Sequence, residues 1–186
     1  ISILEVLEES IYADLMVIDA EETFVRDEMK PPTRFIRDLL SDVQCPVLIV
    51  PSSQWVPPAF TDVEKTVMLY DGEPSSVFAI KMYSYLLPSL HKLPTTVLSV
   101  NAEGNHLANK HLVKEFIKKH VPHATYKVIS GDAEQEILKF MQLQPAGTLA
   151  VLGAYRRGTV SRWFRHSMAD ALMEKLLLPL FIAHNK

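Results

Sequence analysis

Short apolar segments alternate with amphipathic ones from Lys65 to the end of the chain, and this alternation restricts the fold more than any other feature. The apolar segments lack polar alternation, as expected of strands that helices cover on both faces of a parallel sheet. They span residues 65–71, 95–101, 125–130, 148–152 and 180–184, and helical spacing predicts helices at 74–90, 105–121, 132–143 and from about Ser167. The pattern predicts an α/β protein with a doubly wound, parallel, five-stranded sheet.

The first fifty residues contain a shorter version of the same pattern. Residues 1–51 predict helix, strand, helix, strand, and the same order returns over residues 133–186, with a proline beginning the last strand in both places (Pro46 and Pro179). We interpret this as an internal repeat, the alternative being a chance likeness of two strand–helix units. The predicted organisation is a partial domain over 1–51, a proline-rich linker over 52–64 and a complete domain over 65–186.

Composition excludes several classes of protein. The chain has 186 residues, 48% of them hydrophobic and 22% charged, with a net charge of −3, which offers no general attraction to nucleic acid. Cys45 is the single cysteine, so no intrachain disulfide forms, which fits a reducing compartment. The sequence contains no apolar run of the roughly 20 residues that cross a bilayer and no signal peptide. We expect a cytoplasmic location without a membrane partner. The initial Ile1 suggests part of a longer polypeptide.

A glycine and several arginines follow the apolar segment 148–152. Gly153 begins the expected loop, and the basic residues in that loop are Arg156, Arg157, Arg162 and Arg165. A strand, a glycine, a loop and a helix in this order offer backbone N–H groups and a positive helix end to an anion. The segment is therefore the first candidate for a binding site.

The same stretch resembles the C-terminal part of a universal stress protein (UspA) domain, a likeness that extends over nearly the whole chain. Many members hold ATP with Gly, two residues, Gly, nine residues, Gly and then Ser or Thr. Gly153 matches the first glycine and Ser167 the final hydroxyl, whereas Arg156 and His166 replace the second and third glycines, and Gly158 lies out of register. The ending LPLFIAH and the order of elements support the family more than the altered motif supports ATP binding.

This resemblance implies strand order 3-2-1-4-5, in which the first and fourth strands are neighbours where the winding reverses. Ligands bind outside the carboxyl ends of strands at such a point. The order therefore brings Asp71 and Gly72, which end the strand at 65–71, close to Gly153. In the family an aspartate at this place lies against the adenosine, and the residue matching Val100 meets adenine through its backbone. The alternatives are a turn or helix-capping role for Asp71 and core packing for Val100.

The two departures from the motif have definite physical consequences. Arg156 takes space that phosphate uses in the family, although a guanidinium can itself bind phosphate or carboxylate. The alternative is a solvated basic loop for Arg156 and Arg157. His166 adds bulk beside the phosphates, with a packed or solvent-facing histidine as the alternative to a general base. Ser167 suits a phosphate contact or a helix N-cap equally, since Asp170 follows three residues later.

Three functions follow from these observations. The first is a regulatory protein of the stress response that has a degenerate ATP motif and acts through dimer or partner contacts. In the family, subunits or tandem domains pair along the fifth strand, so residues 46–50 and 180–184 are expected to pair antiparallel, within the chain or across a homodimer. The second is an ATP- or AMP-binding module that uses the arginine-rich loop 156–165. The third is an enzyme such as a slow ATPase, which no acid–base pair supports. We expect no metal site, because His106, His111, His120 and His123 lack the pairing of a helical zinc site.

Overall fold

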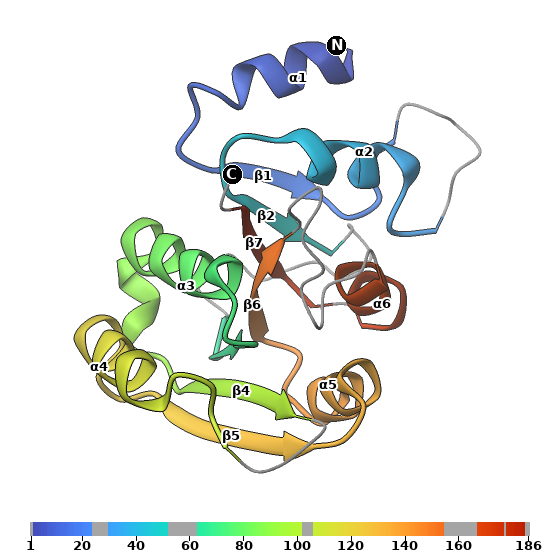
Figure 1. Cartoon of the computed structure of the whole chain (residues 1–186). Helices are drawn as coiled ribbons and strands as arrows, with labels where there is room; N and C mark the ends of the chain where they lie inside the picture. The colour runs from blue at the N-terminus through green and yellow to red at the C-terminus, as the bar shows by residue number, and fades with distance from the viewer. Residues whose placement is uncertain are drawn as a thin grey trace.

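A computed structural model describes residues 2–23, 30–51, 63–101, 106–154, 167–176 and 178–184. The chain forms one mixed α/β structure around a seven-stranded sheet with the strand order β1-β2-β7-β6-β3-β4-β5 (Figure 1). The strands are β1 (Met16–Asp19), β2 (Val47–Val50), β3 (Lys65–Leu69), β4 (Thr95–Asn101), β5 (Thr125–Ser130), β6 (Thr148–Ala154) and β7 (Leu180–His184). The helices are α1 (Ile3–Glu9), α2 (Arg34–Asp42), α3 (Pro74–Leu86), α4 (Lys110–His120), α5 (Ala133–Gln142) and α6 (Ser167–Lys175).

The strands from β3 to β7 have the predicted doubly wound order. β3 pairs in parallel with β4 on one side and with β6 on the other, while β5 follows β4 and β7 follows β6. Numbered along this part of the chain, the order is 3-2-1-4-5, as the family resemblance implied. The winding reverses between β3 and β6, so the carboxyl ends of these two strands define the expected ligand position.

The expected pairing between residues 46–50 and 180–184 is present within the chain. β2 runs antiparallel to β7, with Leu48 opposite Phe181. All other strand pairs in the sheet are parallel. The facing edges of β2 and β7 are therefore hydrogen-bonded to each other, so the predicted pairing occurs within the chain.

One backbone contact recurs in the two segments that the sequence predicts to be copies of a repeat. Met16 N–H donates to the Pro46 carbonyl at 2.9 Å, and Ala150 N–H donates to the Pro179 carbonyl at 3.0 Å. The first bond joins β1 to the proline that precedes β2, and the second joins β6 to the proline that precedes β7. The pairing of β2 with β7 makes both copies parts of one continuous sheet. The domain division at 52–64 stays a prediction, since residues 52–62 lie outside the described part, while Val63 packs in the core.

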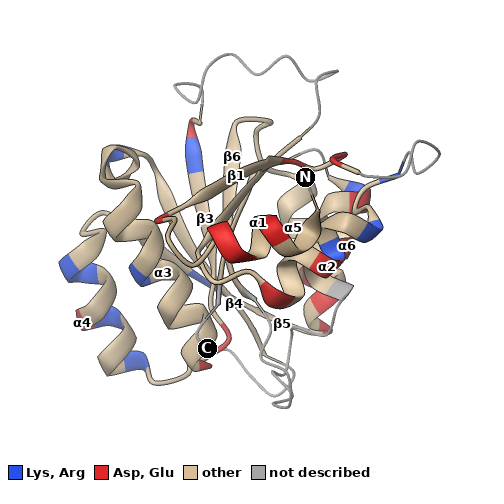
Figure 2. Cartoon of the chain, turned by 90° about the horizontal axis from the view of Figure 1, so that it is seen from above, with Lys and Arg blue, Asp and Glu red and all other residues tan. Residues whose placement is uncertain are grey.

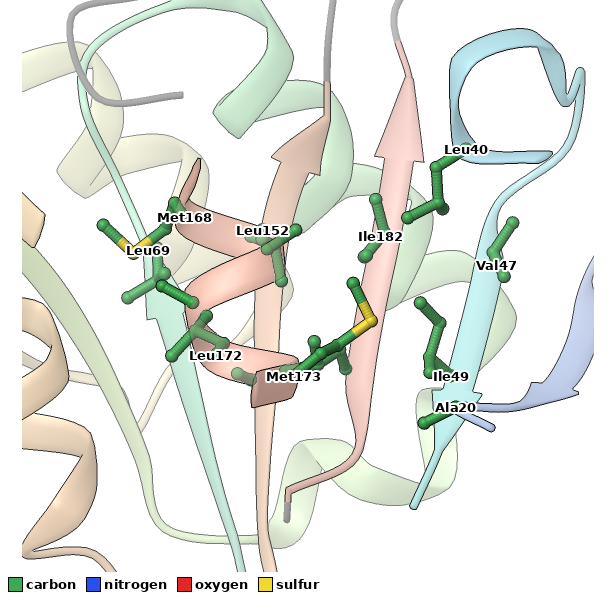
Figure 3. Close-up of a cluster of buried hydrophobic side chains, with 14 of the residues drawn as sticks. Ala20, Leu40, Val47, Ile49, Leu69, Leu152, Met168, Leu172, Met173 and Ile182 are labelled. Atoms are coloured by element: carbon green, nitrogen blue, oxygen red, sulfur yellow. The ribbon is translucent and has the colours of Figure 1, made fainter. Parts of the chain in front are cut away.

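Apolar side chains fill the spaces on both faces of the sheet. Helices α2, α5 and α6 cover one face, and α3 and α4 cover the other (Figure 1). In Figure 3, Met168, Leu172 and Met173 of α6 lie over side chains of the strands, with Leu40 of α2 at the other side of the same cluster. Arg37 Nε lies 3.2 Å from Asp170 Oδ2, which links α2 to α6 at the rim of this layer. The segments 1–51 and 133–184 are thus joined by side-chain packing as well as by the hydrogen bonds between β2 and β7.

Two helices are shorter than their apolar spacing predicts. The helix expected over 74–90 ends at Leu86, and residues 88–92 form a separate 3₁₀ helix. Pro88 explains the break, because proline disfavours helical geometry in the preceding residue, and Leu87 has φ −124° and ψ 52°. The helix expected from residue 105 begins at Lys110, after Asn109 in the left-handed region with φ 47°. On this helix, apolar spacing alone predicts that both Leu112 and Val113 face the core, but Leu112 is 68% exposed and only Val113 is buried.

The charged side chains of the helices face solvent. Figure 2 shows basic residues along α4 and acidic residues on α1. They are Lys110, Lys114, Lys118 and Lys119 on α4, and Glu5, Glu8 and Glu9 on α1. Cys45, the single cysteine, is buried as a free thiol, and burial raises its pKa. Within the described ranges, no helix is long and apolar enough to span a bilayer.

Candidate functional site at the carboxyl ends of β3 and β6

Asp71 lies just beyond β3 and is 9% exposed. Its Oδ1 accepts a hydrogen bond from the Glu73 N–H at 2.9 Å, which closes the turn before α3. The turn role considered from the sequence is therefore present, but the N-cap residue of α3 is Glu73, not Asp71. The second carboxylate oxygen, Oδ2, is buried and has no hydrogen-bond partner among the described residues. A buried oxygen without a donor is costly, so this atom marks a place where a ligand group or water would be held.

Gly72 is required by the backbone and by its neighbour. Its φ is +88°, which favours glycine, and a β-carbon there would lie 2.7 Å from Ala108 Cβ. Gly72 also borders a pocket of about 240 Å³ between α3 and α4. The other lining residues are Tyr70, Val77, Asn109, Leu112, Val113 and Phe116. Most of these residues are apolar. The Tyr70 hydroxyl donates a hydrogen bond to the Ala108 carbonyl at 3.0 Å.

Gly153 occupies a different position from the one expected. The sequence placed it at the end of a strand, whereas it lies inside β6 and pairs with Ala183 of β7. A β-carbon on Gly153 would lie 2.4 Å from the Ser75 carbonyl carbon and 2.7 Å from the Ser76 nitrogen. The glycine therefore permits the first turn of α3 to approach β6, a contact that sequence reasoning did not identify.

The predicted convergence of Asp71, Gly72 and Gly153 follows from the register of the sheet. Met68 of β3 lies opposite Val151 of β6, and continuing this parallel register by two residues places Tyr70 beside Gly153. Asp71 and Gly72 come directly after Tyr70 in the sequence. They form the turn that leads into α3, the helix whose first turn contacts Gly153. The topology thus brings these three residues to the same end of the sheet.

Val100 lies one residue before the end of β4. Its side chain is 1% exposed and belongs to the core on the face of α5 and α6, so it has the packing role considered for it. Contact between its backbone and adenine stays a prediction. The adjacent Ser99 has a buried hydroxyl with no partner in the described part of the chain. Nothing in the sequence distinguished Ser99 from other strand residues.

The remaining predicted site residues lie mostly outside the described ranges. These are Arg156, Arg157, Gly158 and His166, together with the rest of the loop 155–166. Ser167 is the first residue of α6, and its side chain is not among those described. Asp170, in the first turn of α6, accepts a hydrogen bond from Arg37 Nε. The Asp170 carboxylate therefore interacts with Arg37 of α2.

The histidines on and near α4 show one pairing that the sequence reasoning overlooked. His111 Nδ1 lies 3.6 Å from Glu115 Oε2, four residues later on the exposed face of α4. This is a single surface pair. The residues that the structure describes contain no group of three side chains able to hold a metal ion.

The strand order, the reversal point and the glycine turn define a doubly wound α/β protein with a candidate ligand site at the carboxyl ends of its central strands. No family model matches the chain, and no curated protein matches it. Solved structures do match. A universal stress protein from Archaeoglobus fulgidus DSM 4304 aligns with a TM-score of 0.70 and 14% identity, covering 99% of this chain and 67% of that one.

Two further structures extend this comparison. A putative universal stress protein from Pseudomonas aeruginosa UCBPP-PA14 aligns with a TM-score of 0.57 at 12% identity, covering 96% of this chain and 66% of that one. The cytoplasmic domain of a prokaryotic cation chloride cotransporter aligns with a TM-score of 0.56 at 14% identity, with coverages of 95% and 68%. This chain has the fold of the universal stress proteins, as the resemblance predicted, and spans about two thirds of the lengths of these proteins.

Proposed function

We propose that this chain is a universal-stress-protein-like regulatory protein of the cytoplasmic stress response, which acts through protein contacts and no longer depends on ATP. The observation that carries the proposal is the position of Gly153. This is the one motif glycine retained in register, and the approach of Ser75 and Ser76 accounts for it without a nucleotide. The close approach of α3 to β6 is therefore sufficient to explain why the sequence retains Gly153.

The two lost glycines support the same conclusion. Arg156 and His166 stand where the family motif has glycine. Side chains at these positions fill space beside a polyphosphate and restrict a backbone that glycine leaves free. The fold itself does not decide the matter, since one scaffold supports many functions. The solved structures with this fold include both universal stress proteins and the cytoplasmic domain of a cotransporter.

A nucleotide titration tests this proposal. A ligand that binds only the folded state at 100 times its Kd adds about 2.7 kcal/mol to the unfolding free energy. At about 1 mM ATP or AMP, even a Kd of about 10 μM therefore gives a clear rise in melting temperature. We expect no rise for either nucleotide. A rise of several degrees would contradict the proposal.

Asp71 Oδ2, which has no partner within the described ranges, favours a second candidate function. This function is binding of ATP or AMP, with arginines of loop 156–165 in place of the glycine contacts. A buried carboxylate oxygen at the switch point suits a hydroxyl or amine donor of a bound nucleoside. In that case AMP raises the melting temperature, and Asp71→Asn removes the rise because an amide group replaces one acceptor oxygen. A slow ATPase would add phosphate release that depends on Asp71. Absence of the AMP effect in the unaltered protein would reject this candidate.

A further inference from the structure

The pocket between α3 and α4 is open to solvent and has an apolar interior. Its volume is about 240 Å³, and its most deeply buried lining residues are Tyr70 and Val113, which are 1% and 4% exposed. Val77 of α3 and Phe116 of α4 are half-buried and line its sides. Leu112 of α4, at 68% exposure, lies at the rim. A ligand that enters this pocket therefore covers apolar surface that now faces water.

This pocket is separate from the predicted nucleotide site. Consecutive residues of a strand point to opposite faces of the sheet. Leu69 packs with Val100, the predicted adenine contact, on the face of α5 and α6, whereas Tyr70 packs on the face of α3 and α4. Of the described lining residues, only Gly72 also belongs to the predicted nucleotide site. The volume lies below the roughly 300 Å³ at which sites for drug-sized ligands begin, so the pocket suits a ligand smaller than a nucleotide.

One corner of the pocket is polar. The Tyr70 hydroxyl donates to the Ala108 carbonyl at 3.0 Å. Burial raises the pKa of Tyr70, and a hydrogen bond with the Asn109 side chain opposes that rise. An amide group has two donors and an acceptor oxygen, so one bond to Tyr70 uses only part of the capacity of Asn109. Because Asn109 is exposed and lines the pocket, its amide is accessible to a ligand there.

The backbone of Asn109 holds this amide in place. Its φ of 47° and ψ of 41° lie in the left-handed region, which is uncommon for residues other than glycine. Asn109 is the N-cap residue of α4, yet its side chain makes no capping hydrogen bond. Capping, the usual role of asparagine at this position, therefore does not account for the side chain. Backbone conformations of this kind are concentrated at binding and catalytic sites.

We propose that this pocket binds a small aromatic molecule that carries one hydrogen-bonding group, such as a phenol. The ring of the ligand lies against Tyr70 and Phe116, since aromatic rings pack favourably in offset or edge-to-face pairs. Its hydroxyl group bonds to the Asn109 amide, and this single polar contact fixes its orientation, as in other mostly apolar sites. The inference goes beyond the proposed function and does not depend on whether the chain binds nucleotide.

Titration of the unaltered protein with p-cresol, followed by backbone amide NMR, tests the proposal. We expect a Kd below about 1 mM, with the largest shift changes at the amides of Leu112, Val113 and Phe116. Toluene has the same ring and methyl group without the hydroxyl. Asn109→Gly removes the amide and suits the left-handed backbone, so the variant should fold. It should lower the ratio of p-cresol affinity to toluene affinity by about fivefold.

Two further variants test the apolar part of the pocket. Val77→Phe places a ring inside the cavity and should abolish p-cresol binding. Leu112→Ala, at an exposed position that leaves the core intact, should weaken binding by about threefold. The matched control is Leu143→Ala, which shortens an 83% exposed leucine outside the pocket and should leave the affinity unchanged.

Four results would overturn the proposal. The first is the absence of shift changes at the pocket amides at about 5 mM p-cresol. The second is an equal loss of affinity in Leu112→Ala and Leu143→Ala, and the third is an unchanged affinity ratio in Asn109→Gly. The fourth concerns N-acetyltyrosine amide, in which the same phenol is joined to a peptide backbone. Binding at least about tenfold tighter than that of p-cresol would assign the pocket to a tyrosine side chain of a protein partner.

Discussion

Thr66 Oγ1 and Tyr83 Oη lie 3.0 Å apart and join β3 to α3 by a hydrogen bond inside the core. Both residues are fully buried, and burial raises the pKa of Tyr83 to about 12 despite the opposing effect of the Thr66 hydroxyl. Tyr83→Phe keeps the ring and leaves Thr66 Oγ1 without this partner. We expect the unfolding free energy to fall by about 1–2 kcal/mol in urea titrations.

The matched control for this change lies on the same helix. Tyr85 is 57% exposed, so Tyr85→Phe should alter the unfolding free energy by less than about 0.5 kcal/mol. Equal effects of the two substitutions would show that the Thr66–Tyr83 bond contributes nothing specific.

Gly153 provides a test of the contact between β6 and α3. Gly153→Ala places a β-carbon against the backbone of Ser75 and Ser76, which cannot move aside as a flexible side chain can. We expect the substitution to lower the unfolding free energy by about 1–3 kcal/mol, as overpacking commonly does. Unchanged stability would mean that α3 does not approach β6 as closely as the structure places it.

We expect His120 to make the stability of the protein depend on pH. The centroid of its ring lies 4.7 Å from the ring centroid of Phe116 and 5.6 Å from that of Tyr85. Burial, followed by the charges of Lys119, His91 and Lys81, lowers the pKa of His120 below 6.5. Because the folded-state pKa is the lower one, protonation favours the unfolded state. The stabilising contribution is therefore complete above about pH 6.5 and lost as pH falls through the folded-state pKa.

Urea unfolding at several pH values measures this effect by comparison with a variant. His120→Gln removes the titrating ring, so the variant should lose less stability than the unaltered protein between pH 7 and about pH 5. His111→Gln, at an exposed position on the same helix, is the control. Identical pH profiles for the unaltered protein and His120→Gln would reject the assignment.

Much of the fold was predictable because the chain alternates strands and helices so regularly. The strands at 95–101, 125–130 and 180–184 have the expected bounds, and the antiparallel pairing of β2 with β7 is confirmed. The predicted bounds of two helices were wrong, because the backbone geometry of one residue outweighs the apolar spacing of the helix. Pro88 ends α3 early, and the left-handed Asn109 delays α4.

The site was harder to predict because its details depend on contacts between distant segments. The strand order that the family resemblance implies placed Asp71, Gly72 and Gly153 at one end of the sheet. It could not show that Gly153 accommodates Ser75, or that one oxygen of Asp71 has no hydrogen-bond partner among the residues that the structure describes. Leu4 and Val17 have the spacing of core residues, yet they are 73% and 60% exposed in the structure.

We propose that side-chain bulk at two positions of the family motif, Arg156 and His166, has removed nucleotide binding from this protein. The most direct test is calorimetric titration of ATP into the unaltered protein and into Arg156→Gly/His166→Gly, which restores the spacing of the family motif. The matched control is Arg157→Gly/His166→Gly, which places the first introduced glycine one residue out of register. We predict binding by the restored variant alone. Tight binding of ATP by the unaltered protein, equal to that of the restored variant, would contradict the claim.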